Sequence, residues 1–232
     1  GCFGVGLIPT GSQDPYALRR QALGVVRIVN AFSLDIDLDE ALAVAVQAYG
    51  GRFDNEDGLI QSVLDFFRQR MRGMLIEQGV RHDLVEAVIG VGVEDVAGVF
   101  ARAEALAAFS ESPEFEALVT AHERAANLAS KGDTDEISAE LFQTDAERDL
   151  FAQIGVVRER LDVLVAAERW SDALAELAGL RPYVDRLFED VMVMAPEEDL
   201  RRNRLARLRR TVKLLEVLNM PYKVVVTFTD LE

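Results

Sequence analysis

Residues 9–20 of this 232-residue chain read Pro-Thr-Gly-Ser-Gln-Asp-Pro-Tyr-Ala-Leu-Arg-Arg, and this stretch predicts a turn followed by a helix. Gly11-Ser12 is typical of a turn, and Asp14 is suited to accept hydrogen bonds from the first free amides of a helix. Pro15 is expected at the first helical position, where its missing N–H costs nothing. Apolar residues then recur at helical spacing, at Leu18, Ala22, Val25 and Val29.

The remainder of the chain has the same helical pattern, which predicts an all-α fold of helical bundles. Thr144 and Glu147 have capping-box spacing, and Ser112-Pro113 begins another helix. Residues 131–138 are expected to form the main internal loop, and only residues 222–229 are strand-like, without a second strand to pair with. Helices are expected at residues 14–30, 39–49, 56–78, 83–90, 93–110, 113–131, 145–169, 171–180, 182–192 and 197–218.

Composition excludes several classes of protein. No stretch approaches the run of about 18 apolar residues that a membrane span needs, so no membrane partner is expected. The single cysteine, Cys2, excludes an internal disulfide framework and is typical of the reducing cytoplasm. The chain begins with Gly1 instead of Met, and we expect it to be the C-terminal part of a larger subunit.

The charge of the chain is unevenly distributed. The formal net charge is −15, from 25 Lys/Arg and 40 Asp/Glu. Residues 1–100 carry 8 basic against 14 acidic residues and residues 101–200 carry 9 against 23, whereas residues 201–232 carry 8 against 3. A local basic stripe on an acidic body can still attract phosphate, because salt confines surface fields to about 8 Å. Any RNA contact is therefore expected to be local.

Four stretches resemble the β subunits of bacterial heterotetrameric glycyl-tRNA synthetases. Residues 9–20 are similar to the family signature P-T-G-S-[KQ]-D-P-[FY]-A-L-R-R. Residues 117–131 resemble A-x-K-R-V-x-N-I-L, in which Arg124 and Asn127 match, while Glu123 stands where the family usually has Lys. Two further stretches resemble V-D-x-F-F-D-x-V-M-V-M-A and L-R-x-N-R-L-A-L-L, at residues 184–195 and 200–208.

The resemblance implies two helical domains and a binding role. Residues 1–100 would be the end of an HD-like helical body, residues 101–218 a DALR-type anticodon-binding domain, and residues 219–232 a tail of unknown structure. In the family, glycine activation with ATP and Mg takes place on the α subunit, and the β subunit holds the tRNA. The chain is thus expected to bind tRNA(Gly) within an α₂β₂ tetramer of this ligase, without a catalytic residue, metal or cofactor of its own.

Helical geometry indicates which residues of the 113–131 helix could face RNA. Its apolar face consists of Phe115, Leu118, Val119, Ala125, Ala126 and Ala129. The opposite side carries Thr120, Arg124, Asn127 and Lys131, within about 60° of one another. Arginine can bind cytosine O2 and N3 or a phosphate, and asparagine can meet a base edge. The alternative is a polar face that only contacts solvent.

The 197–218 helix supplies a second set of candidates. Its apolar seam consists of Leu205, Leu208, Val212 and Leu215. Arg201 and Arg204 lie near this seam and are expected to pair with acids such as Asp185 or Asp190. The outward cations are candidate phosphate contacts or, alternatively, internal salt-bridge partners: Arg202, Arg209, Arg210 and Lys213.

Two other functions compete with tRNA binding. The chain could be a helical scaffold for α/β assembly that does not touch RNA. The pair His82-Asp83 can mark a metal-dependent phosphohydrolase, but such a site needs further histidines, and the only other one, His122, falls on an apolar face. Met192 and Met194 are expected in the core. There is no P-loop, CxxC pair or nucleophile with a base.

Overall fold

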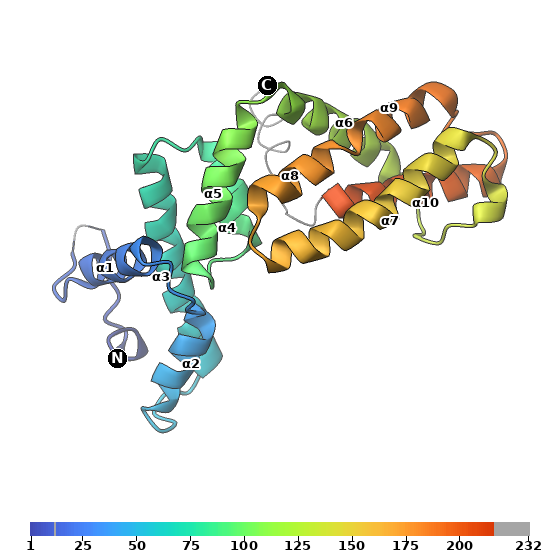
Figure 1. The fold of residues 1–232 in the computed structure, drawn as a ribbon. Coiled ribbons are helices and arrows are strands. Elements are labelled where there is room, and N and C mark those ends of the chain that lie inside the picture. The colour runs from blue at the N-terminus through green and yellow to red at the C-terminus, as the bar shows by residue number, and fades with distance from the viewer. Residues whose placement is uncertain (12, 216–232) are drawn as a thin grey trace. The chain divides into compact units, whose positions relative to one another are not determined.

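The computed structural model describes residues 1–11 and 13–215, and this part of the chain consists of helices and loops without a β-strand (Figure 1). The all-α prediction is therefore confirmed. The chain divides into two compact units, Gly1–Glu104 and Ala105–Glu232, which are called unit 1 and unit 2 below. The end of the last expected helix, the strand-like residues 222–229 and the tail lie outside the described residues.

Unit 1 is built around its longest helix, α3 (Glu56–Glu77). This helix packs against its neighbours on both sides in the sequence, and its buried residues include Leu64, Met71 and Leu75. The elements that contact it are η1 (Phe3–Val5), α1 (Leu18–Ala31), α2 (Leu38–Gln47) and α4 (His82–Val91). The helix α5 (Val96–Ser110) runs from unit 1 into the start of unit 2.

The start of α1 differs in part from the sequence prediction. The carboxylate of Asp14 accepts hydrogen bonds from the amides of Leu18 (2.8 Å) and Arg19 (3.0 Å), as expected. The helix begins only at Leu18, however, and Ala17 before it has φ +55°. The prediction that Pro15 occupies the first helical position is therefore wrong, because the chain makes a further turn before the helix starts.

Unit 2 encloses its last helix, α10 (Glu198–Leu215), between other helices. The helix α10 packs against α6 (Pro113–Ala129) and α7 (Asp145–Ala166), and η2 (Ala139–Leu141) also touches it (Figure 1). The remaining helices, α8 (Trp170–Ala178) and α9 (Arg181–Asp190), pack against α6 and α7. Although α10 is rich in arginine, most of its side chains are buried, including Arg204 and Arg207.

Local sequence signals explain several helix ends of unit 2. Thr144 and Glu147 form the expected capping box at the start of α7, and Pro113 occupies the first turn of α6. Residues 131–138 form a loop, also as expected. The prediction that Met192 and Met194 lie in the core is wrong: they are 70% and 44% exposed, because α9 ends at Asp190 and the segment after it alternates buried and exposed residues.

Candidate nucleic-acid interface

The polar side of α6 is exposed as its helical spacing predicted. Thr120, Arg124 and Asn127 are exposed on the helix, and Lys131 is exposed just after its end. The opposite side is buried at Phe115, Leu118, Ala125 and Ala129, with Val119 and Ala126 half-buried. The Thr120 hydroxyl donates to the Glu116 carbonyl (2.9 Å), so it is already engaged by its own helix. The structure thus places the four predicted residues, Thr120, Arg124, Asn127 and Lys131, on one accessible surface.

Arg124 is held in place by α9. Its guanidinium lies over the ring of Phe188, 4.5 Å from the centroid, and its Nη1 atom is 3.8 Å from Oδ1 of Asp185. Asp185 also pairs with Arg181 at 3.2 Å, so one carboxylate serves two arginines. A guanidinium stacked on a ring keeps its N–H edge free to face a base or a phosphate. Sequence reasoning found Arg124 but not the ring beneath it.

Three of the four outward cations of α10 contact the loop of residues 131–138. Arg202 lies 3.1 Å from Asp133, and Arg209 lies 2.9 Å from Asp135 and donates to the Gly132 carbonyl at 2.9 Å. Lys213 pairs with the same Asp135 carboxylate, and its hydrogen bond and that of Arg209 lower the pKa of Asp135. These pairs are exposed to solvent, where ion pairs contribute little to stability, so a phosphate could replace the carboxylate at little cost.

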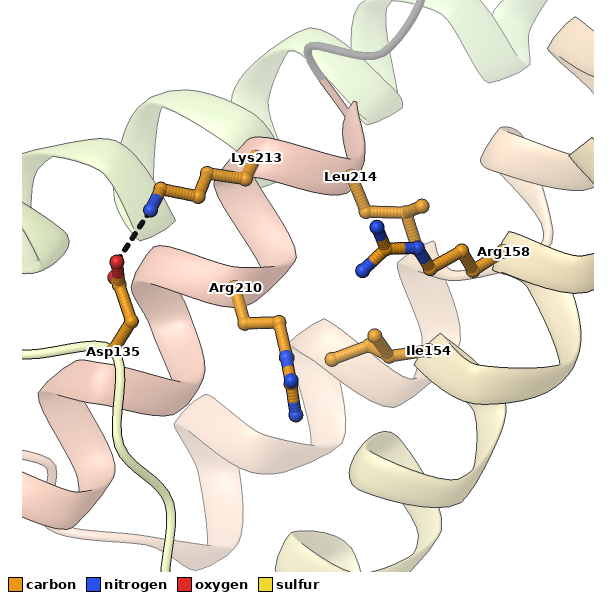
Figure 2. Close-up of a pocket in the computed structure, with 6 residues that line it drawn as sticks. All are labelled: Asp135, Ile154, Arg158, Arg210, Lys213 and Leu214. Carbon is orange, nitrogen blue, oxygen red and sulfur yellow. Dashed lines mark hydrogen bonds and ion pairs between the residues drawn. The ribbon is translucent and has the colours of Figure 1, made fainter. Parts of the chain in front are cut away.

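The fourth outward cation, Arg210, lies in a different environment. Within residues 1–11 and 13–215 it has no carboxylate partner, and its guanidinium is 5.9 Å from the centroid of Phe151. It lines a pocket together with Arg158 of α7 (Figure 2). Sequence reasoning missed Arg158, because it lies on a helix that carries acids as well as bases and no motif marks it.

The near-seam arginines of α10 do not pair with the acids that were expected. Asp185 pairs with Arg124 and Arg181, and Asp190 pairs with Arg186. Arg204 instead donates from Nε to Oε1 of Glu147 (3.1 Å), from Nη1 to the Met192 carbonyl (3.0 Å) and from Nη2 to Gln143 Oε1 (2.9 Å). Arg201 donates to the backbone carbonyls of Ala195 and Pro196 at 3.1 and 3.3 Å. The expected structural role thus holds, but with other partners.

Glu147 lies at the centre of a buried charge cluster. It accepts hydrogen bonds from the amides of Gln143 and Thr144 and from the guanidinium groups of Arg204 and Arg207. Burial raises the pKa of Glu147, but these donors together outweigh burial and lower its pKa to about 2. The carboxylate is therefore ionised and acts as a structural anchor.

The HD pair does not assemble a metal centre in the described part of the chain. His82 is exposed, with its Nε2 atom 4.0 Å from Oε1 of Glu86, and Asp83 pairs with Arg81 at 2.6 Å. No cluster of three or more His, Cys, Asp or Glu side chains suited to a metal occurs among residues 1–11 and 13–215. His122 is buried as expected, and burial lowers its pKa to about 4. None of the described helices is both long and apolar enough to cross a membrane.

Comparison with known proteins gives two family matches. Residues 1–90 match the family described as glycyl-tRNA synthetase beta subunit, and residues 118–220 match the DALR anticodon binding domain. The second match contains both the polar side of α6 and the basic helix α10. All candidate residues of unit 2 named above therefore lie within the DALR match, whereas His82 and Asp83 lie outside it.

Curated relatives match nearly the whole chain. The glycine–tRNA ligase beta subunit of Desulforudis audaxviator is 42% identical over 217 residues, which is 93% of this chain and 32% of the relative. The beta subunit of Moorella thermoacetica is 40% identical to this chain over 220 residues, which is 93% of this chain and 32% of the relative. The beta subunit of Nitratidesulfovibrio vulgaris is 42% identical to this chain over 228 residues, which is 94% of this chain and 33% of the relative. The chain spans about a third of the length of these relatives. It therefore belongs to the family of glycyl-tRNA synthetase β subunits.

Proposed function

We propose that this chain is the tRNA-binding part of a glycine–tRNA ligase, and that it positions tRNA(Gly) for ATP-dependent glycylation on an α subunit. The observation that carries the proposal is the match of residues 118–220 to an anticodon-binding domain. The exposed polar side of α6 lies within that match and supports it. In this proposal residues 1–100 belong to the helical body, and residues 101–218 form the domain that meets the tRNA.

The α6 surface has the chemistry that cytosine recognition requires. Glycine codons begin with GG, so glycine anticodons share two cytosines, each with an N4 donor and O2 and N3 acceptors. Arg124 and Asn127 lie one helical turn apart and expose donors and an amide oxygen. Stacking on Phe188 restricts the Arg124 guanidinium before any base arrives, so less conformational entropy is lost on binding. Thr120 and Lys131 would flank these two residues.

The basic side chains of α10 would supply contacts that do not depend on sequence. A chain with a net charge of −15 repels RNA as a whole, so backbone contacts must be confined to a local positive surface. Arg202, Arg209, Arg210 and Lys213 are exposed or half-exposed on one helix. Exposed ion pairs with Asp133 and Asp135 are weak enough to exchange for phosphate. ATP and Mg would act on the α subunit, within a cytoplasmic α₂β₂ enzyme.

A helical scaffold without RNA contact is the second candidate function. The observation in its favour is that Arg202, Arg209 and Lys213 already pair with acids of the loop of residues 131–138. One titration separates the two functions: tRNA(Gly) and a non-cognate tRNA are each bound to the chain at two salt concentrations. The proposal predicts a preference for tRNA(Gly) and a loss of affinity with salt. Absence of binding to either tRNA would leave only the scaffold.

A further inference from the structure

A small pocket opens between α7 and α10 in unit 2. Figure 2 shows it between two helices that are far apart in the sequence. Its volume is about 270 Å³. Its basic side chains come from both helices, and Lys213 turns toward Asp135 on the loop of residues 131–138. The residues that line it are Asp135, Ile154, Arg158, Arg210, Lys213 and Leu214.

Two arginines of this pocket, unlike nearly all others in unit 2, have no carboxylate partner among the described residues. Between residues 105 and 215, ten arginines have a carboxylate oxygen within 4.0 Å, at positions 124, 148, 160, 169, 181, 186, 202, 204, 207 and 209. Arg201 has none but donates to two backbone carbonyls. The other two without a described carboxylate partner, Arg158 and Arg210, line the same pocket.

The surroundings of Arg210 and Lys213 leave positive charge in the pocket. Phe151 lies 5.9 Å from the Arg210 guanidinium, a distance at which a ring orients a cation without neutralising it. Asp135 supplies one negative charge, but Arg209 and Lys213 share it. The pocket lining therefore carries three cations, Arg158, Arg210 and Lys213, against the single carboxylate of Asp135. In a chain with 40 acidic residues against 25 basic ones, this arrangement attracts an anion.

We infer that this pocket binds a backbone phosphate of RNA, with Arg158 and Arg210 as the two hydrogen-bonding partners and Lys213 as a third charge. Planar guanidinium groups match phosphate oxygens in pairs, which makes arginine suited to this ligand. The volume is at the small end for ligand sites, which suits a phosphate with part of its ribose. Ile154 and Leu214 provide apolar contact for the sugar.

The inference rests on the proposed function, because it takes tRNA as the ligand, and it goes further in two ways. It adds a residue of α7, Arg158, to an interface otherwise assigned to α6 and α10. It also ranks the basic residues of α10: Arg210 contacts phosphate directly, whereas Arg202 and Arg209 chiefly hold the loop of residues 131–138.

The test measures tRNA affinity of the chain as a function of salt for wild type, Arg158→Gln and Arg210→Gln. Arg160→Gln is the matched control, since it removes the same charge two residues away on α7 from an arginine paired with Glu176. Each pocket variant is expected to weaken cognate and non-cognate tRNA alike by about three- to tenfold. Each should also reduce the slope of log K against log salt by about 0.7–0.9, the value for one lost phosphate contact. The control should stay near wild type.

Two results would overturn the inference. In the first, both pocket variants keep the affinity and salt slope of the wild type; in the second, Arg160→Gln loses as much as they do, which would indicate a general charge effect. Both leave the proposed function standing, because the wild-type chain still binds tRNA. If the wild type binds no tRNA, the proposed function itself fails. Unfolding midpoints followed by Trp170 fluorescence check that the variants fold, and they should be unchanged because Arg158 and Arg210 are exposed.

Inorganic phosphate provides a second measurement that needs no RNA. The NMR signals of the Arg158 and Arg210 Nε–Hε groups, assigned from the two variants, should shift on phosphate titration at constant ionic strength, and that of Arg160 should not. If the signals of all three arginines shift together, or if none shifts, phosphate does not bind specifically at this pocket. Competition of the same phosphate with bound tRNA would show that free phosphate and the RNA backbone use the same pocket.

Discussion

The Nη1 atom of Arg207 lies 3.2 Å from Oε1 of Glu147, and both side chains are fully buried. Arg204 reaches the same oxygen at 3.1 Å, while the other carboxylate oxygen accepts hydrogen bonds from the amides of Gln143 and Thr144. Arg207 also lies over the ring of Phe142, 4.2 Å from its centroid. One carboxylate at the start of α7 thus compensates two cations of α10, which explains how so basic a helix can be buried.

Replacing Glu147 with Gln is expected to destabilise unit 2 strongly. The change removes one partner of a buried ion pair and leaves the Arg204 and Arg207 cations uncompensated, which costs about 3–5 kcal/mol. Urea unfolding followed by the fluorescence of Trp170, the single tryptophan, reports on unit 2. Asp145→Asn is the control, because it removes an acid of the same helix from an exposed pair with Arg148. The free energy of unfolding of the control should fall by less than about 1 kcal/mol. An equal fall in both variants would contradict the role assigned to the cluster.

Buried His122 predicts a loss of stability in mildly acidic solution. Burial lowers its pKa from 6.5 to about 4, so between these two values the unfolded chain binds a proton that the folded chain does not. Stability is therefore greatest above about pH 6.5 and falls as the pH drops toward 4, by up to about 3 kcal/mol. His122→Leu should remove this dependence from the unfolding midpoint of unit 2, whereas His82→Gln, on the surface, should keep it. If the unfolding midpoints of wild type and His122→Leu fall in parallel as the pH drops, the prediction is contradicted.

Removing the Asp135 carboxylate should strengthen RNA binding. Asp135→Asn frees Arg209 and Lys213 from their ion pairs and makes the local surface more positive. Affinity for cognate and non-cognate tRNA is expected to rise by about three- to tenfold, with a steeper dependence on salt. The measurement is a filter-binding or anisotropy titration at two salt concentrations. Asp145→Asn, which removes the same charge elsewhere, is the control. Unchanged binding by Asp135→Asn would favour the scaffold function for α10.

The chain alone is expected to catalyse nothing. Among the described residues, His82 and Asp83 belong to no group of three or more His, Cys, Asp or Glu side chains that could hold a metal, and Asp83 is paired with Arg81. Assays with ATP and glycine should therefore detect no glycyl-adenylate, and assays with phosphate esters and divalent metals should release no phosphate. Metal-dependent phosphate release that disappears in His82→Ala would establish a hydrolase site instead.

The sequence predicted features that depend on neighbours along the chain. The exposed and buried sides of α6 followed from its 3.6-residue period, and the capping box of Thr144 and Glu147 followed from a spacing of three residues. The resemblance of residues 9–20 was confirmed at the level of the family. In each case the deciding information lies in a short stretch of the sequence.

Features that depend on which helices meet could not be predicted in this way. Helical periodicity assigns Arg204 to a face but does not say that this face meets Glu147, 57 residues earlier. The same limit applies to the pocket, where Arg158 and Arg210 come from two helices. The prediction for Met192 was wrong for a different reason: its hydrophobicity suggested a core position, but it follows the end of α9 at an exposed position of a non-helical segment.

The variants Arg124→Ala and Asn127→Ala test whether the polar side of α6 discriminates between anticodons, which is the central proposal. The affinities of wild type and both variants are measured for tRNA(Gly) and for a variant of it whose anticodon cytosines are exchanged. Loss of a good base contact should cost about 1–3 kcal/mol on the cognate tRNA only, so each variant should lose most of the discrimination while keeping residual binding and helix content. If both variants still prefer the cytosine-bearing anticodon by the wild-type margin, the polar side of α6 does not read the anticodon, which contradicts the proposed role of Arg124 and Asn127.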